Sequence, residues 1–348
     1  MSKEPSQNRI EWIDTAKGIC ILLVVINHIL IFCDFANIYK EQYGRISDFL
    51  TSFRMPLYFF LSGLFFKQYG GLLPFAKKKT NKLVVPFSFF YLVFSVAIPL
   101  LIIYSQSPIL GIRSLIPDSP FSTLLLDFYY NDCQLINGPL WFLLCLFEMN
   151  ILFYITTNIS RRLWHVGALS MLIGISGLVL SYMRINLHAS FDTALSCLPF
   201  FAFGFLIRKK TSILYKSVFD KYLIPCALGG FLFCFIVAGH VAFFRNVFDG
   251  YSYLTVHACG CIGTLSVMFL AKYLGHIPLV SYMGRYSIII LCTHTIYLKF
   301  VVGYVLNHFT PLVSAIILIL FIIPIELATI PFMKKYMPHV TAQKDLIK

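Results

Sequence analysis

An apolar stretch near the N-terminus carries ionisable side chains at a spacing that suits catalysis. It reads Asp14-Thr-Ala-Lys17-Gly-Ile-Cys-Ile-Leu-Leu-Val-Val-Ile-Asn27-His28. In a helix, Lys17 and His28 lie on one face, about 16 Å apart along the axis. An imidazole that titrates near neutrality suits a general base. A histidine satisfied by a neighbouring helix is the structural alternative, and the chemistry of the side chain leaves both open.

The two charged residues at the start of this stretch have a simpler explanation. Asp14 and Lys17 are three residues apart, so they could form only an ion pair where the helix enters the membrane. Asn27, next to His28, could hydrogen-bond across helices. Ionisable groups inside an apolar span cost free energy, so we treat this face as a candidate site.

Further polar residues fall inside other apolar runs. Arg54 stands beside Pro56 near the start of the second run, close to the outer surface, where it could reach lipid headgroups or bind a phosphate or a sugar. Glu148 lies near the middle of the fourth run and must be protonated or paired with a histidine or arginine. Trp141, at the start of that run, suits the aromatic belt at a membrane interface.

A late run contains His294, and two more histidines, His240 and His257, sit near the outer ends of the runs before it. Together with His28 and Arg54 they predict a polar cavity that opens outward. Glu326 lies close enough to the cytoplasmic end of its run to reach the surface, and we assign it no role.

The composition requires a membrane. Of 348 residues, 58% are hydrophobic and 12% are charged, and a soluble chain could not keep so much apolar surface away from water. The runs match the length of a spanning helix, and we find no alternation typical of a barrel. We expect an all-α polytopic membrane protein of ten spans, the sixth of them short enough to be tilted or broken: 18–35, 50–66, 83–104, 139–157, 164–182, 194–207, 222–244, 254–274, 287–305 and 312–330.

The net charge of +13 is a topology signal and does not indicate nucleic acid. Most Lys and Arg residues fall in alternate connections, which the positive-inside rule assigns to the cytoplasm. Both termini are then cytoplasmic, in a multi-pass protein of the cell membrane whose first helix serves as its own insertion signal. We expect one membrane domain over 1–348, with a bundle at 18–330 and cytoplasmic ends at 1–17 and 331–348.

The longest polar connection, 105–138, faces outward on this topology. It contains Asp118, Asp127 and Asp132, and long loops often carry function. Most of the ten cysteines lie inside apolar runs, where a thiol packs as a small hydrophobe. The Cys259-Gly-Cys261 pair is too sparse for a metal site, and we expect no metal.

Several motifs in order carry a resemblance to a known family. The pattern Trp-Ile-Asp14-x-x-Lys17-Gly-Ile through His28 resembles the opening of the membrane acyltransferase 3 family, and its lysine resembles the fucose 4-O-acetylase-like and polysaccharide-modifying branch. Three later stretches agree with family motifs, and a fourth, Pro199-Phe-Phe-Ala-Phe-Gly204, also fits. The three are Arg54-Met-Pro-Leu through Leu61-Ser-Gly63, Pro139-Leu-Trp-Phe-Leu143, and Met283-Gly-Arg-Tyr-Ser287 leading to His294.

The resemblance implies transfer of an acyl group, usually acetyl from acetyl-CoA, to a hydroxyl of a glycan or lipid-linked saccharide. His28 would be the general base or a transient acyl carrier. Lys17, oriented by Asp14, would face the CoA phosphates or thioester. Arg54 and His294 would bind or polarise substrate, while Glu148, Trp141 and Asn27 complete the predicted substrate-binding set. The acyl-CoA is a donor substrate, and no bound cofactor is expected.

Two alternatives stay open at this point. A non-enzymatic glycan or lipid exporter would also carry intramembrane histidines and a broken helix. It would not need the arrangement of Lys17 and His28. An acyltransferase with another donor, such as succinyl-CoA, is the second alternative, because a longer acyl group needs a different pocket and no different motif.

Overall fold

Apolar helices make up the computed structural model of the chain, which describes residues 10–97, 137–210, 218–248 and 253–347. Eight of the described helices are long and apolar enough to cross a membrane. The protein is therefore an all-α, multi-pass membrane protein, as predicted. The predicted loop at 105–138, with Asp118, Asp127 and Asp132, lies outside the described residues except for its last two positions.

The first half of the chain contains two long helices joined by a short one, then a stretch divided into several short helical segments, and then another long helix. Its elements are α1 (Glu11–Phe32), α2 (Phe35–Ile38), α3 (Lys40–Leu64), α4 (Leu72–Lys79), the π-helical η1 (Thr80–Val84), α5 (Val85–Tyr91), the π-helical η2 (Leu92–Ala97), the 3₁₀ turn η4 (Gly138–Leu140) and α8 (Trp141–Ile159). Pro139 occupies the first turn of η4, where a proline is preorganised for a helix start.

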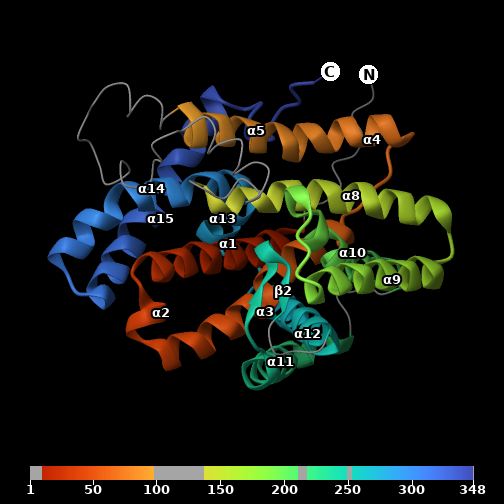
Figure 1. The fold of residues 1–348 in the computed structure, drawn as a ribbon, viewed down its shortest axis with the longest axis horizontal. Coiled ribbons are helices and arrows are strands. Elements are labelled where there is room, and N and C mark those ends of the chain that lie inside the picture. Colours follow the sequence, from red (N-terminus) through yellow and green to blue (C-terminus); the bar gives the residue numbers. More distant parts are fainter. Residues whose placement is uncertain (1–9, 98–136, 211–217, 249–252, 348) are drawn as a thin grey trace.

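The second half alternates long helices with short connecting elements. These are α9 (Leu163–Tyr182), η5 (His188–Ser190), α10 (Phe191–Lys210), η6 (Val218–Tyr222), α11 (Leu223–Val237), β1 (Val241–Ala242), η7 (Phe243–Arg245), β2 (Val247–Phe248), α12 (Tyr253–Leu274), α13 (Pro278–Arg285), α14 (Ser287–His308) and α15 (Pro311–Tyr336). The helices α1, α4, α5, α8 and α9 are drawn lengthwise across Figure 1.

Two pairs of glycines allow helices to approach at backbone distance. A Cβ at Gly18 of α1 would overlap the carbonyl oxygen of Val280, and one at Gly284 of α13 would overlap the carbonyl oxygen of Asp14. Gly63 of α3 and Gly204 of α10 pack in the same reciprocal way. Small residues serve this purpose in membrane bundles, where packing rather than the hydrophobic effect joins helices. The contact between α1 and α13 fixes the half of α1 that holds Asp14 and Lys17.

Thr15 adds hydrogen bonds to the same contact between α1 and α13. Its hydroxyl donates to the carbonyl oxygen of Gly275 (2.7 Å), lies 2.8 Å from the hydroxyl of Ser281, and accepts the amide of Ile277 (3.4 Å). Thr15 is fully buried. The connection from α12 to α13 is therefore tied to the first helix by hydrogen bonds as well as by close packing.

Several helices differ from the predicted spans at their ends. The sixth predicted run, 194–207, lies in α10, which has 20 residues around Pro199 and is as long as its neighbours. The seventh predicted span, 222–244, is too long, because α11 ends at Val237 and the chain then forms the hairpin β1–β2. Helix α15 continues to Tyr336, past the predicted boundary at 330.

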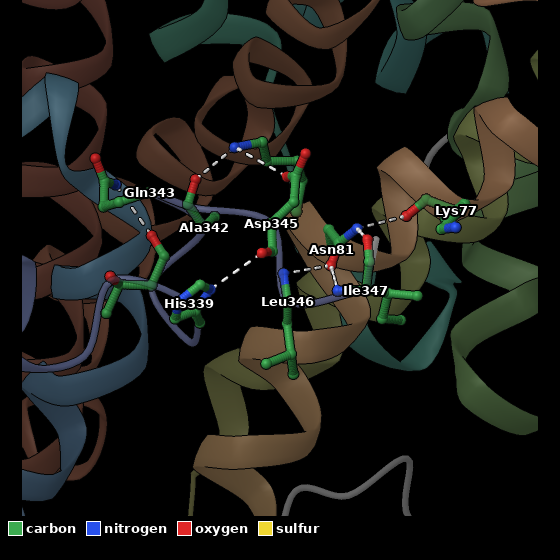
Figure 2. A network of polar contacts seen from close by, with 10 residues as sticks. Lys77, Asn81, His339, Ala342, Gln343, Asp345, Leu346 and Ile347 are labelled. Atoms are coloured by element: carbon green, nitrogen blue, oxygen red, sulfur yellow. Dashed lines mark hydrogen bonds and ion pairs between the residues drawn. The ribbon is translucent and has the colours of Figure 1, made fainter.

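The predicted C-terminal tail is folded against the start of the third pass (Figure 2). The Asn81 amide nitrogen donates to the carbonyl oxygen of Ile347 (2.9 Å), and its oxygen accepts the amides of Leu346 and Ile347 (2.9 and 2.8 Å). Lys82 Nζ donates to the carbonyl oxygen of Ala342 at 2.6 Å. The buried side-chain amide of Asn81 thus supplies the hydrogen-bond partners for the backbone at the end of the chain.

Candidate functional site

A cavity of about 620 Å³ opens where α1, α3 and α8 meet the hairpin β1–β2. We call it the His28 cavity. Its wall includes His28 and Asn27 of α1, Arg54 of α3 and Trp141 of α8, while Arg184, His240 and Arg245 line it from connecting segments. Of the residues predicted to form a polar cavity, His28, Arg54 and His240 line this space, although they are far apart in the sequence.

His28 contacts His294 across the boundary between α1 and α14. The Nε2 atom of His294 lies 3.3 Å from Nδ1 of His28, and the ring centroids are 5.0 Å apart at an interplanar angle of 63°. His294 is fully buried. The two imidazoles are therefore one unit, with His28 on the cavity side and His294 behind it.

Backbone carbonyls assign the hydrogens on this pair of neutral rings. Nδ1 of His28 lies 2.8 Å from the carbonyl oxygen of Val24, and Nδ1 of His294 lies 2.7 Å from that of Ile290. A carbonyl oxygen only accepts, so each Nδ1 carries the hydrogen and donates it. Nε2 of His294 then accepts from His28, which shares its Nδ1 hydrogen between two acceptors. Nε2 of His28 keeps its lone pair, which is the state that a general base or a nucleophile needs.

Buried hydrogen bonds on either side of His294 hold this part of α14 in place. Thr293 donates to both carboxyl oxygens of Glu326 (2.9 and 2.8 Å). Thr295 donates to Asn137 Oδ1 (2.7 Å), and Asn137 Nδ2 donates to the carbonyl oxygen of Cys292 (2.8 Å). Asn137 directly precedes the turn that lines the cavity, so this network joins the cavity wall to the histidine pair.

Glu326 corrects the prediction made from its position in the sequence. It does not reach the surface at the end of its helix, because its side chain is fully buried and turned toward Thr293. A buried carboxyl group is expensive unless it is hydrogen-bonded, and the hydroxyl of Thr293 supplies that bond. The pattern Thr293-His294-Thr295 was the available sequence signal, since three consecutive polar residues interrupt an apolar run.

Arg54 brings a buried cation to the same cavity. Its side chain is only 8% exposed, and its Nε and Nη1 atoms have no hydrogen-bond partner among the described residues. The backbone is anchored, since Cys20 Sγ donates to the carbonyl oxygen of Arg54 at 3.0 Å. A buried guanidinium whose donors lack partners is suited to bind an anionic or strongly polar group from the cavity.

The hairpin forms the wall opposite the helices, and its hydrogen bonds are buried. Asn246 adopts the left-handed conformation (φ 49°), accepts from Ser196 Oγ (2.7 Å) and donates to the carbonyl oxygen of Gly177 (3.0 Å). Thr193 donates to the carbonyl oxygen of Phe243 (2.6 Å). Helices α9 and α10 thus hold a short irregular segment over the cavity, a feature that the apolar run at 222–244 concealed.

A second pocket, of about 720 Å³, lies where α8, α9 and α10 meet the segment after α3. We call it the basic pocket, because Lys67, Arg161, Arg208 and Lys209 line it and no acidic side chain is among its described lining residues. Arg208 Nη1 donates to the carbonyl oxygen of Leu64 at 3.0 Å. These cations make the pocket suitable for a ligand with several negative charges.

The two pockets lie at opposite ends of the same helices. The first turn of α8 lines the His28 cavity, and its last turn and the residues after it line the basic pocket. At the rise of an α-helix these ends are about 25 Å apart. Lys17 lies toward the basic end of α1, with its Nζ 5.7 Å from the centroid of the Phe65 ring, close in sequence to Phe66 of the basic pocket.

The predicted site residues divide into those that share the His28 cavity and those that do not. His28, Asn27, Arg54 and Trp141 line it, His294 supports it, and His240 lies at its rim, 3.3 Å from Asp48. Trp141 is 8% exposed and forms part of the cavity wall. Asp14, Lys17, Glu148 and His257 line neither pocket.

His257 has a structural role instead. Its ring stacks on Phe200 at 4.6 Å, and its nitrogens bond the backbone carbonyls of Tyr253 and Ser196 (2.9 and 3.2 Å). The prediction that it faces the cavity was wrong, because helical position alone does not tell which neighbour a side chain meets. Asp14 is buried beside the close contact of α1 with α13.

Comparison with known protein families identifies the chain. A family model described as an acyltransferase domain matches residues 10–330. The chain belongs to the acyltransferase 3 family. It is therefore an acyltransferase, an enzyme that moves an acyl group from a donor to an acceptor. No curated protein and no solved structure matches the chain.

The matched residues include both halves of the site. His28 and Arg54 fall near the start of the matched range and His294 near its end, so the family match covers every helix that meets at the His28 cavity. An acyltransferase needs a group that activates the acceptor and a place for the donor. The His28 cavity and the basic pocket are the two candidates for these tasks.

Proposed function

We propose that this protein transfers an acyl group, acetyl in the first instance, from acyl-CoA to a hydroxyl of a cell-surface or lipid-linked saccharide, with His28 as general base. The observation that carries the proposal is the pairing of His28 with His294 at the wall of a polar cavity. An unprotonated nitrogen beside a space large enough for a sugar is what activation of a hydroxyl requires.

The reaction follows from the hydrogen positions on the pair. Nε2 of His28 takes the proton of the acceptor hydroxyl, and the hydroxyl oxygen attacks the thioester carbonyl carbon. The C–S bond then breaks, and the sulfur leaves with the proton that His28 holds, giving the ester and free CoA. During this cycle His28 is transiently cationic, and its Nδ1–H bond to His294 strengthens because the donor is charged. His294 is thus a positioning residue for the base.

The donor is proposed to enter at the basic pocket. CoA carries several phosphate charges, and Lys67, Arg161, Arg208 and Lys209 face it with no described carboxylate in the lining. Lys17 lies between the two pockets on α1 and would guide the acyl-bearing arm toward His28, as the family resemblance implies for this residue. The positive-inside rule places the basic end at the cytoplasm, where acyl-CoA is available.

The acceptor is proposed to bind in the His28 cavity from the opposite side. Arg54 and Asn27 present buried polar groups to that space, and Trp141 offers an aromatic wall of the kind on which sugar rings pack. The acyl group would then cross part of the membrane thickness along α1, about 16 Å between Lys17 and His28.

Mass analysis of surface glycans tests this function directly. Cells that lack the protein are compared with cells that express the wild type, His28→Ala or His308→Ala, the last being a matched histidine on an exposed helix end. We expect acyl groups on the glycan only with the wild type and His308→Ala, at equal membrane levels of all proteins. Unchanged acylation without the protein would refute the proposal, and lost glycan export with intact acylation would indicate a transporter.

A further inference from the structure

The electrostatic character of the His28 cavity points to its ligand. Arg54, Arg184 and Arg245 line it together with His28 and His240, and no Asp or Glu side chain is among its described lining residues. At the rim, the carboxylate of Asp48 lies 3.3 Å from the His240 ring. The lining of the cavity therefore carries an excess of positive charge, of which Arg54 is the buried part.

Among these positively charged side chains, Arg54 is the one that is buried. The residue is 8% exposed, and two buried nitrogens of its guanidinium lack any hydrogen-bond partner among the described residues. A buried cation without partners is costly, and a carboxylate or phosphate oxygen would supply both hydrogen bonds and charge. Asn27 Oδ1, which is also buried without a partner, would accept a hydroxyl of the same ligand.

We propose that the acceptor is an acidic saccharide, whose carboxylate or phosphate binds Arg54 while a neighbouring hydroxyl faces His28. This inference rests on the proposed function and specifies its acceptor. Arg184 and Arg245 lie at exposed positions around the opening. There they attract the anion from solution, and Arg54 then holds it by hydrogen bonds in a less hydrated space.

Binding of small probes separates this assignment from its rivals. Isothermal titration calorimetry is performed on the full chain in lipid nanodiscs with glucuronate, glucose 1-phosphate, glucose and inorganic phosphate. We expect glucuronate or glucose 1-phosphate to bind, with glucose at least tenfold weaker. Preference for glucuronate identifies a carboxylate acceptor, and preference for glucose 1-phosphate identifies a phosphorylated one. Equal binding of glucose, or equal binding of inorganic phosphate, overturns the assignment of an acidic saccharide.

Variants locate the bound anion. Arg54→Gln should weaken binding of the preferred probe by about 30-fold or more, as expected when one partner of a buried charge pair is removed, and Arg54→Lys should restore part of it. Arg45→Gln, at an exposed position of the same helix that lines neither pocket, is the matched control and should leave this binding unchanged. Retained binding in a folded Arg54→Gln protein, judged by its elution as a single species, overturns the proposal.

The same variants distinguish failure of this inference from failure of the proposed function. His28→Ala should keep the preference for the acidic probe over glucose, because the anion contacts Arg54. If the anion binds through Arg54 but deletion of the protein leaves surface glycans unchanged, the proposed function fails and the anion site stands. If acylation requires His28 while glucose binds as well as glucuronate, only the assignment of an acidic acceptor fails. An Arg54 that instead stabilises the reacting carbonyl would lower transfer without changing probe affinity.

Discussion

The two pockets hold their charges in opposite ways. At the His28 cavity, His294 is fully buried with both ring nitrogens hydrogen-bonded, while Arg54 is 8% exposed and only its backbone carbonyl is bonded by Cys20. In the basic pocket, Lys67, Arg161 and Lys209 are exposed to solvent. Electrostatic interactions of buried groups are strong, because little solvent screens them, but they depend on the position of each group. Exposed cations attract a ligand from solution, and salt screens that attraction.

This difference suggests a division of labour along one set of helices. The buried end is suited to proton transfer, which depends on the position and protonation state of single atoms. The exposed end is suited to attraction of a multiply charged donor, which many cations share. Substitutions in the buried end should therefore affect the rate of transfer, and substitutions in the exposed end should affect the apparent affinity for the donor.

The largest expected effect is at His28. His28→Gln retains a polar side chain of similar length but removes the base, so we expect the rate of acyl transfer to fall by about 10²- to 10⁴-fold. The apparent affinity for acyl-CoA should not change. Transfer assays on purified protein over a range of acyl-CoA concentrations separate the two quantities. A variant that lost donor affinity and kept its maximal rate would assign His28 to the donor end instead.

His294 should have the next largest effect. His294→Ala removes one of the two acceptors for the His28 Nδ1 hydrogen and leaves the carbonyl oxygen of Val24. The lost bond, to a group that is charged during the reaction, is worth at most about 1.5–3 kcal/mol. This corresponds to a rate loss of about 10- to 150-fold. His294→Gln, which can still accept a hydrogen bond, should recover part of the rate. If His294→Ala and His294→Gln are equally impaired, His294 acts through packing and not through this bond.

Glycine packing between the pockets gives a smaller effect on stability. Gly284→Ala places a methyl group against the carbonyl oxygen of Asp14 and should destabilise the protein by about 1–3 kcal/mol, measured as a lower midpoint of thermal unfolding in detergent. Gly303 on α14 has open space around it, so Gly303→Ala is the matched control and should not lower the midpoint. Equal midpoints for both variants would mean that α1 and α13 can separate without cost.

Single substitutions in the basic pocket should have the smallest effect. We expect Arg161→Gln to raise the KM for acyl-CoA by no more than about tenfold, because exposed cations each contribute about 0.2–1 kcal/mol and share the ligand. The effect should shrink at high salt, since screening weakens the remaining contacts too. A fall in the maximal rate with unchanged KM would exclude the basic pocket from donor binding.

Much of the fold could be predicted because lipid imposes simple rules. Runs of apolar residues gave the helices, since a spanning segment must satisfy its backbone hydrogen bonds internally. The hairpin at 241–248 was not predicted, because it begins with an apolar stretch that continues the preceding run, and its hydrogen bonds join it to Thr193, Ser196 and Gly177 of other helices. Pairings that depend on tertiary contacts leave no periodic pattern in the sequence.

The site was predictable to a similar degree. His28, Arg54 and His294 stood out because charged or titratable groups in apolar runs need a reason to be there. Their convergence on one cavity required the helices to be placed in space, and so did the burial of Glu326 against Thr293. His257 shows what position in the sequence leaves undecided. Like His240 it lies near the outer end of a predicted span, but its contacts are structural. A position on a helix gives depth but not the identity of the neighbour.

The sidedness of transfer tests the central claim most directly. Sealed inside-out and right-side-out membrane vesicles, both containing the native glycan, are given acetyl-CoA labelled in its acetyl group. With the basic pocket at the cytoplasmic face and His28 serving the other side, only inside-out vesicles should acylate the glycan, and the modified glycan should lie in their lumen. Right-side-out vesicles should become active only when made permeable. Transfer from donor and acceptor supplied on the same face of sealed vesicles would contradict the account.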